Sequence, residues 1–344
     1  MKKVAIITDT HCGAGNDNRF LNESFLRFYE DLFFPYLIKH NIKNVIHLGD
    51  TFDRRKYVNF NTLNSWREKV FSRLNSMCDR VDILIGNHDT YFKQTNEVNS
   101  VRELLFTYDK FNIITNAQEV EFYDRKILYL PWICDDNKEA SLELLNTSDS
   151  KLCMGHLEIS GFELYAGHVT DKGMSRSTFD RFFLTLSGHF HQKGTIGNIH
   201  YLGAPYPMMW GDYACDRGFH VLDFETLDLE FIKNEESTFH KIYYDDSKDG
   251  DKDLTQDDYS YLKNKFIKVV VKTKNSPYLF DRYVEYIQSY NPADLTIIDH
   301  NFDDAQKSDD DVDQTKDTLT ILNECIDSLE GDKYKDALKD LLRE

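Results

Sequence analysis

Residues 44–53 read NVIHLGDTFD, a short apolar run that ends in a glycine and two acids. Similar runs end in polar residues at 4–11 and at 81–89, and helices are expected between the three runs at 22–40 and 60–77. Strands that alternate with helices predict βαβ units and a parallel sheet. Because open α/β sheets bind ligands at the carboxyl ends of their strands, the polar residues after each run are candidates for one shared site.

A second series of apolar runs follows the first, and several of its members also end in glycine and histidine. These strands are expected at 126–130, 151–154, 182–186, 200–202, 219–224 and 229–233. The predicted fold class is therefore α/β, with two sheets packed face to face and helices on the outside.

Two smaller parts are expected after a main domain at 1–240. Residues 241–300 would form a small α/β cap. Its elements are a strand at 266–271, a helix at 278–290 and a strand at 294–298. Residues 301–344 combine an acidic linker with apolar residues at i, i+3, i+4 and i+7, which predicts a C-terminal helical hairpin.

The charge of the chain is unevenly distributed. Its 344 residues carry a net charge of −18, from 59 acidic and 41 basic residues. Such an excess argues against a basic nucleic-acid coat protein. However, 245–258 holds seven acids against two lysines and 299–317 holds eight against two, so these runs carry −11 of the total. The excess therefore belongs largely to linkers and leaves an enzyme that acts on DNA open.

Cysteine usage and hydropathy indicate the compartment. Six cysteines are scattered without a C-x-x-C pair, a pattern of neither a disulfide framework nor a zinc site. The first apolar run is too short for a signal peptide, and no later run approaches membrane-spanning length. We expect a cytoplasmic protein that binds no membrane, located in the host cytoplasm if the chain is phage-encoded.

Carboxylate, amide and imidazole side chains occur at the predicted strand ends, each beside a glycine or a sharp turn. The groups are Asp9-x-His11, Gly49-Asp50-x-x-Asp53, Gly86-Asn87-His88-Asp89, Gly155-His156 and Gly188-His189-x-His191. Mixed oxygen and nitrogen ligands suit Mn²⁺ or Fe²⁺, with Zn²⁺ as an alternative. The glycines permit turns that point the next side chain into a common cleft. His47 lies inside a strand and is expected to pack beside this site without binding metal.

The five groups, in this order, resemble the motifs of the calcineurin-like metallophosphoesterases over about residues 4–225. The resemblance implies a two-sheet metallophosphoesterase sandwich that holds two metal ions, expected to be Mn²⁺, with Mg²⁺, Fe²⁺ or Zn²⁺ as alternatives. It assigns Asp9, His11 and His191 to one ion, Asn87, His156 and His189 to the other, and Asp50 to both.

The same resemblance implies catalytic roles for three further residues. His88 would stabilise the transition state or protonate the leaving group. Asp53 and Asp89 would orient the imidazoles of metal ligands, with simple structural hydrogen bonding as the alternative.

Motif details narrow the substrate. Serine/threonine phosphatases of this family have GD-x-x-DRG and GNHE, whereas this chain has GDTFDRR at 49–55 and GNHD at 86–89. These forms are similar to those of SbcD-type nuclease subunits, in particular the phage-type recombination endonucleases. Further similar segments are 130–134, 155–162, 187–191, 201–205 and 211–219. The resemblance implies a Mn²⁺-dependent DNA exo/endonuclease of a recombination and repair complex, with a metal-activated hydroxide as the attacking group.

The resemblance also implies partners. The nuclease would form a homodimer and bind an ABC-type ATPase with a long coiled coil. Arg54, Arg55 and Lys56 directly follow the Asp50 loop and are candidates for DNA phosphate contacts, although they could also be a solvated basic turn. Residues 60–74 could form a dimer helix or an ordinary core helix. The C-terminal helices would bind the ATPase or pack back onto their own domain.

Two other function classes stay open at this point. One is a stand-alone phosphatase or cyclic-nucleotide phosphodiesterase with the same metals, and the other is a metal-free scaffold. The scaffold is disfavoured because every expected ligand position is filled. Cleavage polarity and the balance of exo- and endonuclease activity are not determined by these motifs.

Overall fold

Two six-stranded sheets form the main part of the structure. The computed structural model describes residues 2–165, 168–247 and 257–299. Residues Met1–Ile297 belong to one compact unit. The acidic linker and helical hairpin expected at 301–344 lie outside the described residues.

The first sheet contains the three N-terminal strands that the sequence predicts. Its order is β14-β13-β1-β2-β3-β4, with β1 to β4 parallel and β13 antiparallel to β1. The strands are β1 Lys3–Ile7, β2 Asn44–His47, β3 Arg80–Leu84, β4 Phe111–Ile114, β13 Arg217–Asp223 and β14 Leu229–Asn234. Ile7 pairs with His47 and His47 with Ile83, so the carboxyl ends of β1, β2 and β3 lie at one edge.

The second sheet has the order β11-β12-β10-β7-β6-β5, and its four central strands are parallel. The strands are β5 Gln118–Phe122, β6 Arg125–Leu130, β7 Leu152–His156, β10 Leu184–Gly188, β11 Gly194–Ile196 and β12 Ile199–Tyr201. A separate hairpin pairs β8 Glu163–Tyr165 with β9 His168–Val169. Gly188 pairs with His156, which places the histidines of β7 and of the turn after β10 at the same edge of this sheet.

Both long N-terminal helices are confirmed, and each contains a π-helical turn. The first is α2 Arg19–Arg27, a π turn at Phe28–Phe33 and α3 Phe34–Lys39; the second is α4 Phe60–Trp66, a π turn at Arg67–Phe71 and α5 Ser72–Met77. The first helix begins before the expected residue 22 because the Asn18 side chain caps its free N–H groups. Its π turn ends two residues before Pro35, which cannot donate a backbone hydrogen bond.

Shorter helices complete the main part. They are α1 Ala14–Asp17, α6 Ser100–Leu105, α7 Lys138–Thr147 and two 3₁₀ turns at Arg176–Phe179 and Trp210–Asp212, while a further 3₁₀ turn at Ser260–Leu262 packs in the cap. None of the helices in the described ranges is long and apolar enough to cross a membrane.

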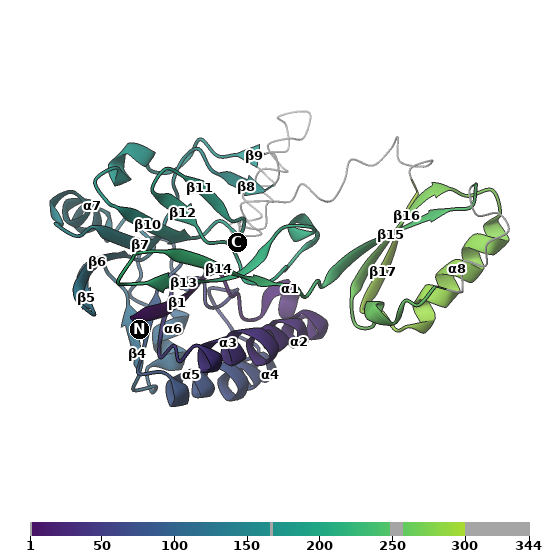
Figure 1. Cartoon of the computed structure of the whole chain (residues 1–344), viewed down its shortest axis with the longest axis horizontal. Coiled ribbons are helices and arrows are strands. Elements are labelled where there is room, and N and C mark those ends of the chain that lie inside the picture. Colours follow the sequence, from purple (N-terminus) through teal and green to yellow (C-terminus); the bar gives the residue numbers. More distant parts are fainter. Residues whose placement is uncertain (1, 166–167, 248–256, 300–344) are drawn as a thin grey trace, which may run out of the picture. The chain divides into compact units, whose positions relative to one another are not determined.

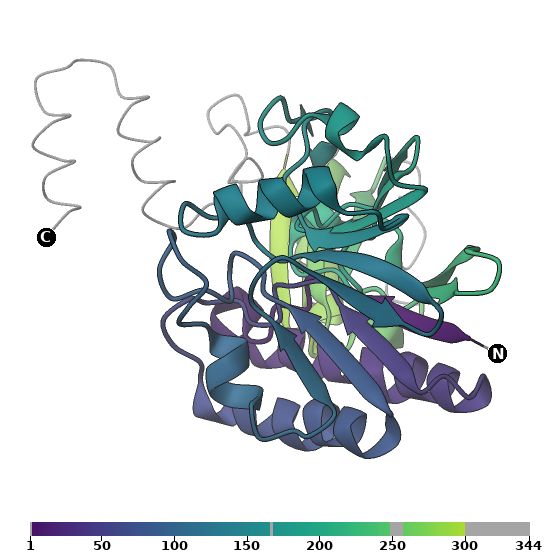
Figure 2. The ribbon, with the colours of Figure 1, turned by 90° about the vertical axis from the view of Figure 1, so that its left-hand side faces the viewer.

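The main part has four layers, which are the N-terminal helices, the first sheet, the second sheet and α7. Apolar side chains pack between each pair of neighbouring layers. One cluster lies between the outer face of the first sheet and the helices α2, α3, α4 and α5. Phe25, Trp66 and Val45 are among its members. A second cluster lies between the sheets, and a third joins the outer face of the second sheet to α7 through Leu145. Figure 2 shows the purple helices below the first sheet and teal α7 above the second. The predicted helix-flanked sandwich is confirmed, because alternate residues of each buried strand face different layers.

The small cap contains a strand that the sequence analysis missed. Its sheet has the order β15-β16-β17, with β15 Phe239–Asp245, β16 Phe266–Thr273 and β17 Asp294–Asp299, and α8 Pro277–Ser289 packs on one face (Figure 1). β15 pairs with β16 in parallel. Its last residue, Asp245, is also the first residue of the acidic run at 245–258, which the sequence predicted to be a linker. The expected domain boundaries at 240 and 300 stay predictions.

A buried carboxylate links the two sheets. Asp82 of β3 accepts hydrogen bonds from Arg80 Nε at 2.7 Å, Asn112 Nδ2 at 2.8 Å and the hydroxyl of Tyr129 at 2.8 Å. Tyr129 belongs to β6, so the contact crosses the apolar layer between the sheets. A buried charge is tolerated there because three donors surround it.

We expect Asp82→Asn to lower the free energy of unfolding by about 1–3 kcal/mol, because the amide cannot accept from all three donors. Chemical denaturation measures this change. Tyr129→Phe removes a single donor and should cost about 1 kcal/mol. Equal stability of the wild type and both variants would contradict a structural role for this contact.

Candidate metal centre

The expected ligands converge where the carboxyl-end edges of the two sheets meet. Asp9 and His11 follow β1, Asp50 follows β2 and Asn87 follows β3. From the second sheet, His156 ends β7, and His189 and His191 follow β10. All of these side chains are buried except that of His191, which is partly buried.

The backbone at this edge is left-handed at four of the expected ligands. The φ angles are 52° at Asp9, 41° at His11, 54° at Asp50 and 89° at His189. Left-handed backbone is uncommon for residues other than glycine and tends to cluster at functional sites. Hydrogen bonds hold these turns, including Asp9 N–H to the Gly49 carbonyl at 3.0 Å and His11 N–H to the Asp50 carbonyl at 3.0 Å.

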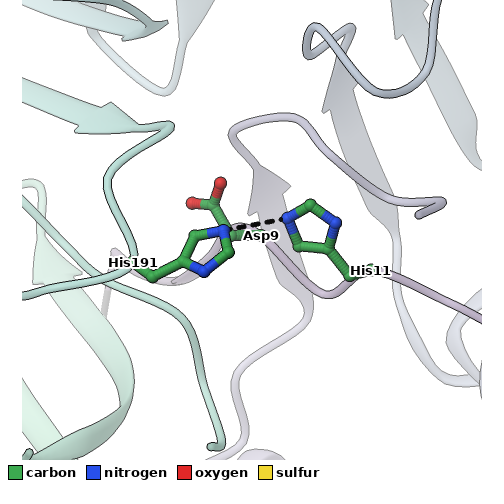
Figure 3. A group of neighbouring side chains, drawn as sticks. All are labelled: Asp9, His11 and His191. Carbon is green, nitrogen blue, oxygen red and sulfur yellow. Dashed lines mark hydrogen bonds between the residues drawn. The ribbon is translucent and has the colours of Figure 1, made fainter. Parts of the chain in front are cut away.

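A first cluster brings together Asp9, His11 and His191. The Nε2 atoms of the two histidines are 3.1 Å apart, and their ring centroids are 4.9 Å apart. Figure 3 shows the two imidazoles reaching toward each other from opposite sides, with the Asp9 carboxylate beside them. One ligand atom of each residue lies within 4.8 Å of the other two.

A second cluster contains Asn87, His156 and His189. The Asn87 Oδ1 atom lies 3.0 Å from His156 Nε2 and 2.9 Å from His189 Nδ1. Asp50 lies between the two clusters, since its Oδ2 is 3.3 Å from His156 Nε2 and 3.7 Å from His11 Nε2. The structure therefore places Asp50 where a bridging ligand would be needed.

The donor set fits two divalent cations. His156 donates from Nδ1 to the Leu48 carbonyl at 2.8 Å, which directs Nε2 toward Asp50 and Asn87. His11 has its Nδ1 3.3 Å from Asp53 Oδ1, which directs its Nε2 toward His191. Imidazoles held from behind by an oxygen atom are typical of metal ligands. Nitrogen, carboxylate and amide donors in such an array match ions of the manganese, iron and zinc group.

Charges in the buried site are balanced by protons on two histidines. Burial opposes the charged form of both His11 and His156, but nearby carboxylates raise the pKa of each to about 9. Burial alone would raise the pKa of Asp50, yet His156 and His88 hold it well below its usual range. Burial lowers the pKa of His189 to about 3. The metal-free protein therefore carries protons where the cations would bind.

His88 lies beside the first cluster, with one ring nitrogen held by a backbone carbonyl. Its ring centroid is 4.8 Å from that of His11. Its Nδ1 lies 2.6 Å from the backbone carbonyl of Asp53, so that atom carries the proton and donates it. The Nε2 atom is then the one available to a substrate.

Asp53 and Asp89 have different surroundings. The Asp53 carboxylate contacts the His11 imidazole, as expected of a residue that orients a ligand. Asp89 instead accepts backbone N–H groups of Gly86 at 2.9 Å, Phe52 at 3.0 Å and Thr51 at 3.3 Å. Its hydrogen bonds join the Asn87 turn to the Asp50 loop, so Asp89 holds the backbone of both.

The three basic residues after Asp53 are not equivalent. Arg54 forms an ion pair with Asp17 and lies over the Tyr57 ring at 4.6 Å. Arg55 donates to the Thr90 hydroxyl at 2.8 Å. Lys56 is exposed, 5.9 Å from the Tyr91 ring centroid. The two arginines therefore already hold loops of the site together, and Lys56 extends furthest toward solvent.

Several neighbours of the site carry no motif of their own. His47 accepts from Gly49 N–H through Nδ1 at 3.2 Å and lies 2.9 Å from the Thr10 hydroxyl through Nε2, so it packs beneath the ligand loops as expected. The Trp132 ring lies 5.1 Å from that of His189 and 6.2 Å from that of His156. Its place at the end of an apolar run, beside Pro131, was the sequence signal for it.

Comparisons with known proteins agree with this geometry. Residues 2–193, more than half of the chain and including every expected ligand, match the family described as calcineurin-like phosphoesterase. The chain is similar to exonuclease subunit 1 of Enterobacteria phage T4, with 30% identity over 242 residues, which cover 70% of each chain.

Two solved structures are also similar. An archaeal phosphodiesterase aligns at a TM-score of 0.34 and 15% identity, over 67% of this chain and 99% of its own. A protein of unknown function from Aquifex aeolicus, AQ665, aligns at 0.28 and 20%, over 45% of this chain and 77% of its own.

Gly86→Ala should weaken the binding of both cations, because a Cβ there would overlap the backbone nitrogen and Oδ1 of Asp50, which lies between the two clusters. Metal analysis of the purified variant, together with its thermal denaturation, tests this expectation. Gly194→Ala is the matched control, since a Cβ at that position meets only the Phe162 ring at 3.5 Å. Full metal content in a folded Gly86→Ala protein would contradict the close approach.

Metal binding should release protons, because His11 and His156 are protonated below pH 9 and a cation needs their lone pairs. Affinity for Mn²⁺ should therefore fall as pH decreases, with up to about two protons released per protein near neutral pH. Calorimetry in buffers of different ionisation enthalpy measures the release. His11→Gln should release about one proton fewer, and binding without proton release would show that both imidazoles are neutral.

Proposed function

The chain belongs to the calcineurin-like phosphoesterase family, and we propose that it is the nuclease subunit of a DNA recombination and repair complex. Membership supports a metal-dependent phosphodiester hydrolase. The finer proposal is a Mn²⁺-dependent DNA exo/endonuclease that works in the cytoplasm. The observation that carries it is the convergence of seven ligands and His88 in a chain similar to a phage exonuclease subunit.

The geometry divides the chemistry among the residues of the site. Asp9, His11 and His191 would hold one cation, Asn87, His156 and His189 the other, and Asp50 would contact both. Two bound cations would neutralise phosphate charge and make water a better nucleophile.

His88 is positioned to act on the substrate directly. Its Nδ1 donates to the Asp53 carbonyl, which leaves Nε2 for the substrate. In the doubly protonated imidazolium, Nε2 would donate a proton to the departing oxygen of the phosphodiester. Its own backbone N–H donates to Asp50 Oδ1 at 2.8 Å, which couples the position of His88 to that of the bridging carboxylate.

We further propose that the cap contacts DNA. Lys241 of β15 and Lys268 and Lys272 of β16 share the sheet face opposite α8, because the intervening Ile242, Val269 and Val271 pack toward that helix. Lys272 Nζ lies 4.6 Å from the ring centroid of Tyr243, which is 56% exposed. Lys241 and Lys268 lie over the rings of Tyr213 and Trp210 at 4.7 and 4.5 Å, so Lys272 and Tyr243 are the groups of this face proposed to meet phosphates and bases.

A homodimer is proposed through α4. Phe60, the first residue of this helix, is 87% exposed, and the neighbouring Tyr57 is 63% exposed. Large apolar side chains with such exposure are typical of protein interfaces when they cluster. The ABC-type ATPase partner with its coiled coil is proposed to bind the C-terminal helices of 301–344, and Arg54, Arg55 and Lys56 are proposed to contact DNA at the cleft rim.

The purified protein should degrade DNA with Mn²⁺, and His88→Gln should reduce cleavage by about 10²–10⁴-fold, since it removes the proton donor. The proposal assigns His88 to neither cation, so Mn²⁺ content should stay at the wild-type value. A loss of one ion would instead assign a cation to the group of His11, Asp53 and His88, whose ligand atoms lie within 4.8 Å of one another. His200→Gln, on β12, is the matched control and should retain activity. The measurement is single-turnover cleavage of labelled single- and double-stranded DNA.

Two outcomes would contradict the proposal. Absence of DNA cleavage with any divalent cation, with and without the ATPase subunit, would exclude a DNA nuclease. Rapid turnover of small phosphoesters together with that absence would instead support a stand-alone phosphatase or cyclic-nucleotide phosphodiesterase.

A further inference from the structure

A buried ion pair lies directly behind one of the expected metal ligands. Arg217, at the start of β13, is 2% exposed, and its Nη2 donates to Asp212 Oδ1 at 2.6 Å. The Nη1 atom of the same guanidinium donates to the backbone carbonyl of His191. One side chain of the first sheet therefore holds the loop that carries a ligand of the second sheet.

The other contacts of this ion pair tie the same loop to its surroundings. The His191 carbonyl also accepts from the Ala204 N–H at 3.0 Å, so two donors fix its direction. The second oxygen of Asp212 accepts from the N–H groups of Met208 at 2.8 Å and Met209 at 3.2 Å. The pair thus connects β13, the segment before the Trp210 turn and the His191 loop.

A contribution to the free energy of folding does not explain well why the Arg217–Asp212 ion pair is buried. Removing two charges from water costs several kcal/mol per ion, and apolar replacements of buried ion pairs are often neutral or stabilising. Arg217 also leaves its Nε atom without a hydrogen-bond partner within the described ranges. A geometric role explains the pair better, because His191 must keep its Nε2 within 3.1 Å of His11 Nε2 across the junction of the two sheets.

The remaining ligands are held in other ways. His156 is fixed through its imidazole by the Leu48 carbonyl, and His11 through its imidazole by Asp53. His189 is fixed through its backbone N–H, which donates to both oxygens of Asp9 at 3.1 Å. Arg217 therefore contacts the first cluster through the carbonyl of His191. Arg217 takes no part in the hydrogen bonds described above for His156 and His189.

We propose that Arg217, held by Asp212, is a positioning residue for His191 and thereby for the cation of the first cluster. This inference rests on the two-cation centre proposed above. The cation of the second cluster is independent of the ion pair. Neither Arg217 nor Asp212 touches the substrate, so their effect on cleavage passes through the metal content of the site.

The experiment is Mn²⁺ binding to the full-length protein, followed by equilibrium dialysis and electron paramagnetic resonance. Wild-type protein should bind two ions with the signal of a coupled pair. Arg217→Met should weaken one ion by about 10–100-fold and leave the other unchanged, so that the signal becomes that of an isolated ion. Asp212→Asn should act in the same direction, and Arg217→Lys should recover part of the loss because it keeps a donor.

Asp82→Asn separates this role from general destabilisation. It disturbs the ion pair of a buried carboxylate with the partly exposed Arg80, which contacts none of the expected ligands, so it should lower the melting temperature of the metal-free protein and keep both ions. If Arg217→Met does not fold, Arg217→Lys tests the proposal. A positioning role predicts partial loss of one ion in this variant, and a purely structural role predicts no such loss.

The outcomes are distinguishable. Two ions of unchanged affinity in a folded Arg217→Met or Arg217→Lys protein would overturn the inference and leave the proposed function intact. Equal weakening of both ions would also overturn it, because the second cluster is expected to be independent. Fewer than two ions in the wild type would overturn the two-cation centre and, with it, both proposals.

Discussion

The close approach of Gly86 to Asp50 is the constraint on which the rest of the site depends. No side chain fits at Gly86, because any Cβ would overlap the backbone and the carboxylate of Asp50. At the second sheet, a Cβ on Gly188 would overlap the Thr8 hydroxyl in the same way. These two glycines let the turns after β3 and β10 press against the turns after β2 and β1. Ligands from both sheets can then reach the same two cations.

This packing has a cost in backbone strain and buried charge, and hydrogen bonds offset it. The left-handed residues Asp9 and His11 are held by carbonyls of Gly49 and Asp50. Asp89 lies fully buried with three backbone donors, and burial together with Asp50 raises its pKa to about 7. The ligand loops are therefore pre-organised by the protein. Cations would replace protons on His11 and His156 without requiring the turns to move.

The sequence alone indicated which polar side chains would meet at the shared edge, because their positions follow from local rules, whereas their assignment as metal ligands comes from the family resemblance. A parallel strand ends, a glycine turns the chain, and the next polar side chain points to the shared edge, as at Gly49-Asp50 and Gly188-His189. Contacts between distant segments follow no such rule. The ion pair of Arg217 with Asp212 reaches His191 only after β13 has paired with β1. The ion pair of Arg54 with Asp17 was hidden for the same reason, and the sequence could not decide between the two roles considered for Asp89.

A site shared between two sheets links catalysis to the packing of the whole sandwich. The distance between His11 and His191 depends on how β1 and β10 lie relative to each other, and the layer of apolar side chains between the sheets sets that relation. Apolar packing alone is non-directional, so it cannot fix a position to a few tenths of an ångström. Directional contacts across the junction, such as Arg217 to the His191 carbonyl and His189 N–H to Asp9, provide that precision. They explain why buried charged groups are kept beside a core that apolar residues could otherwise fill.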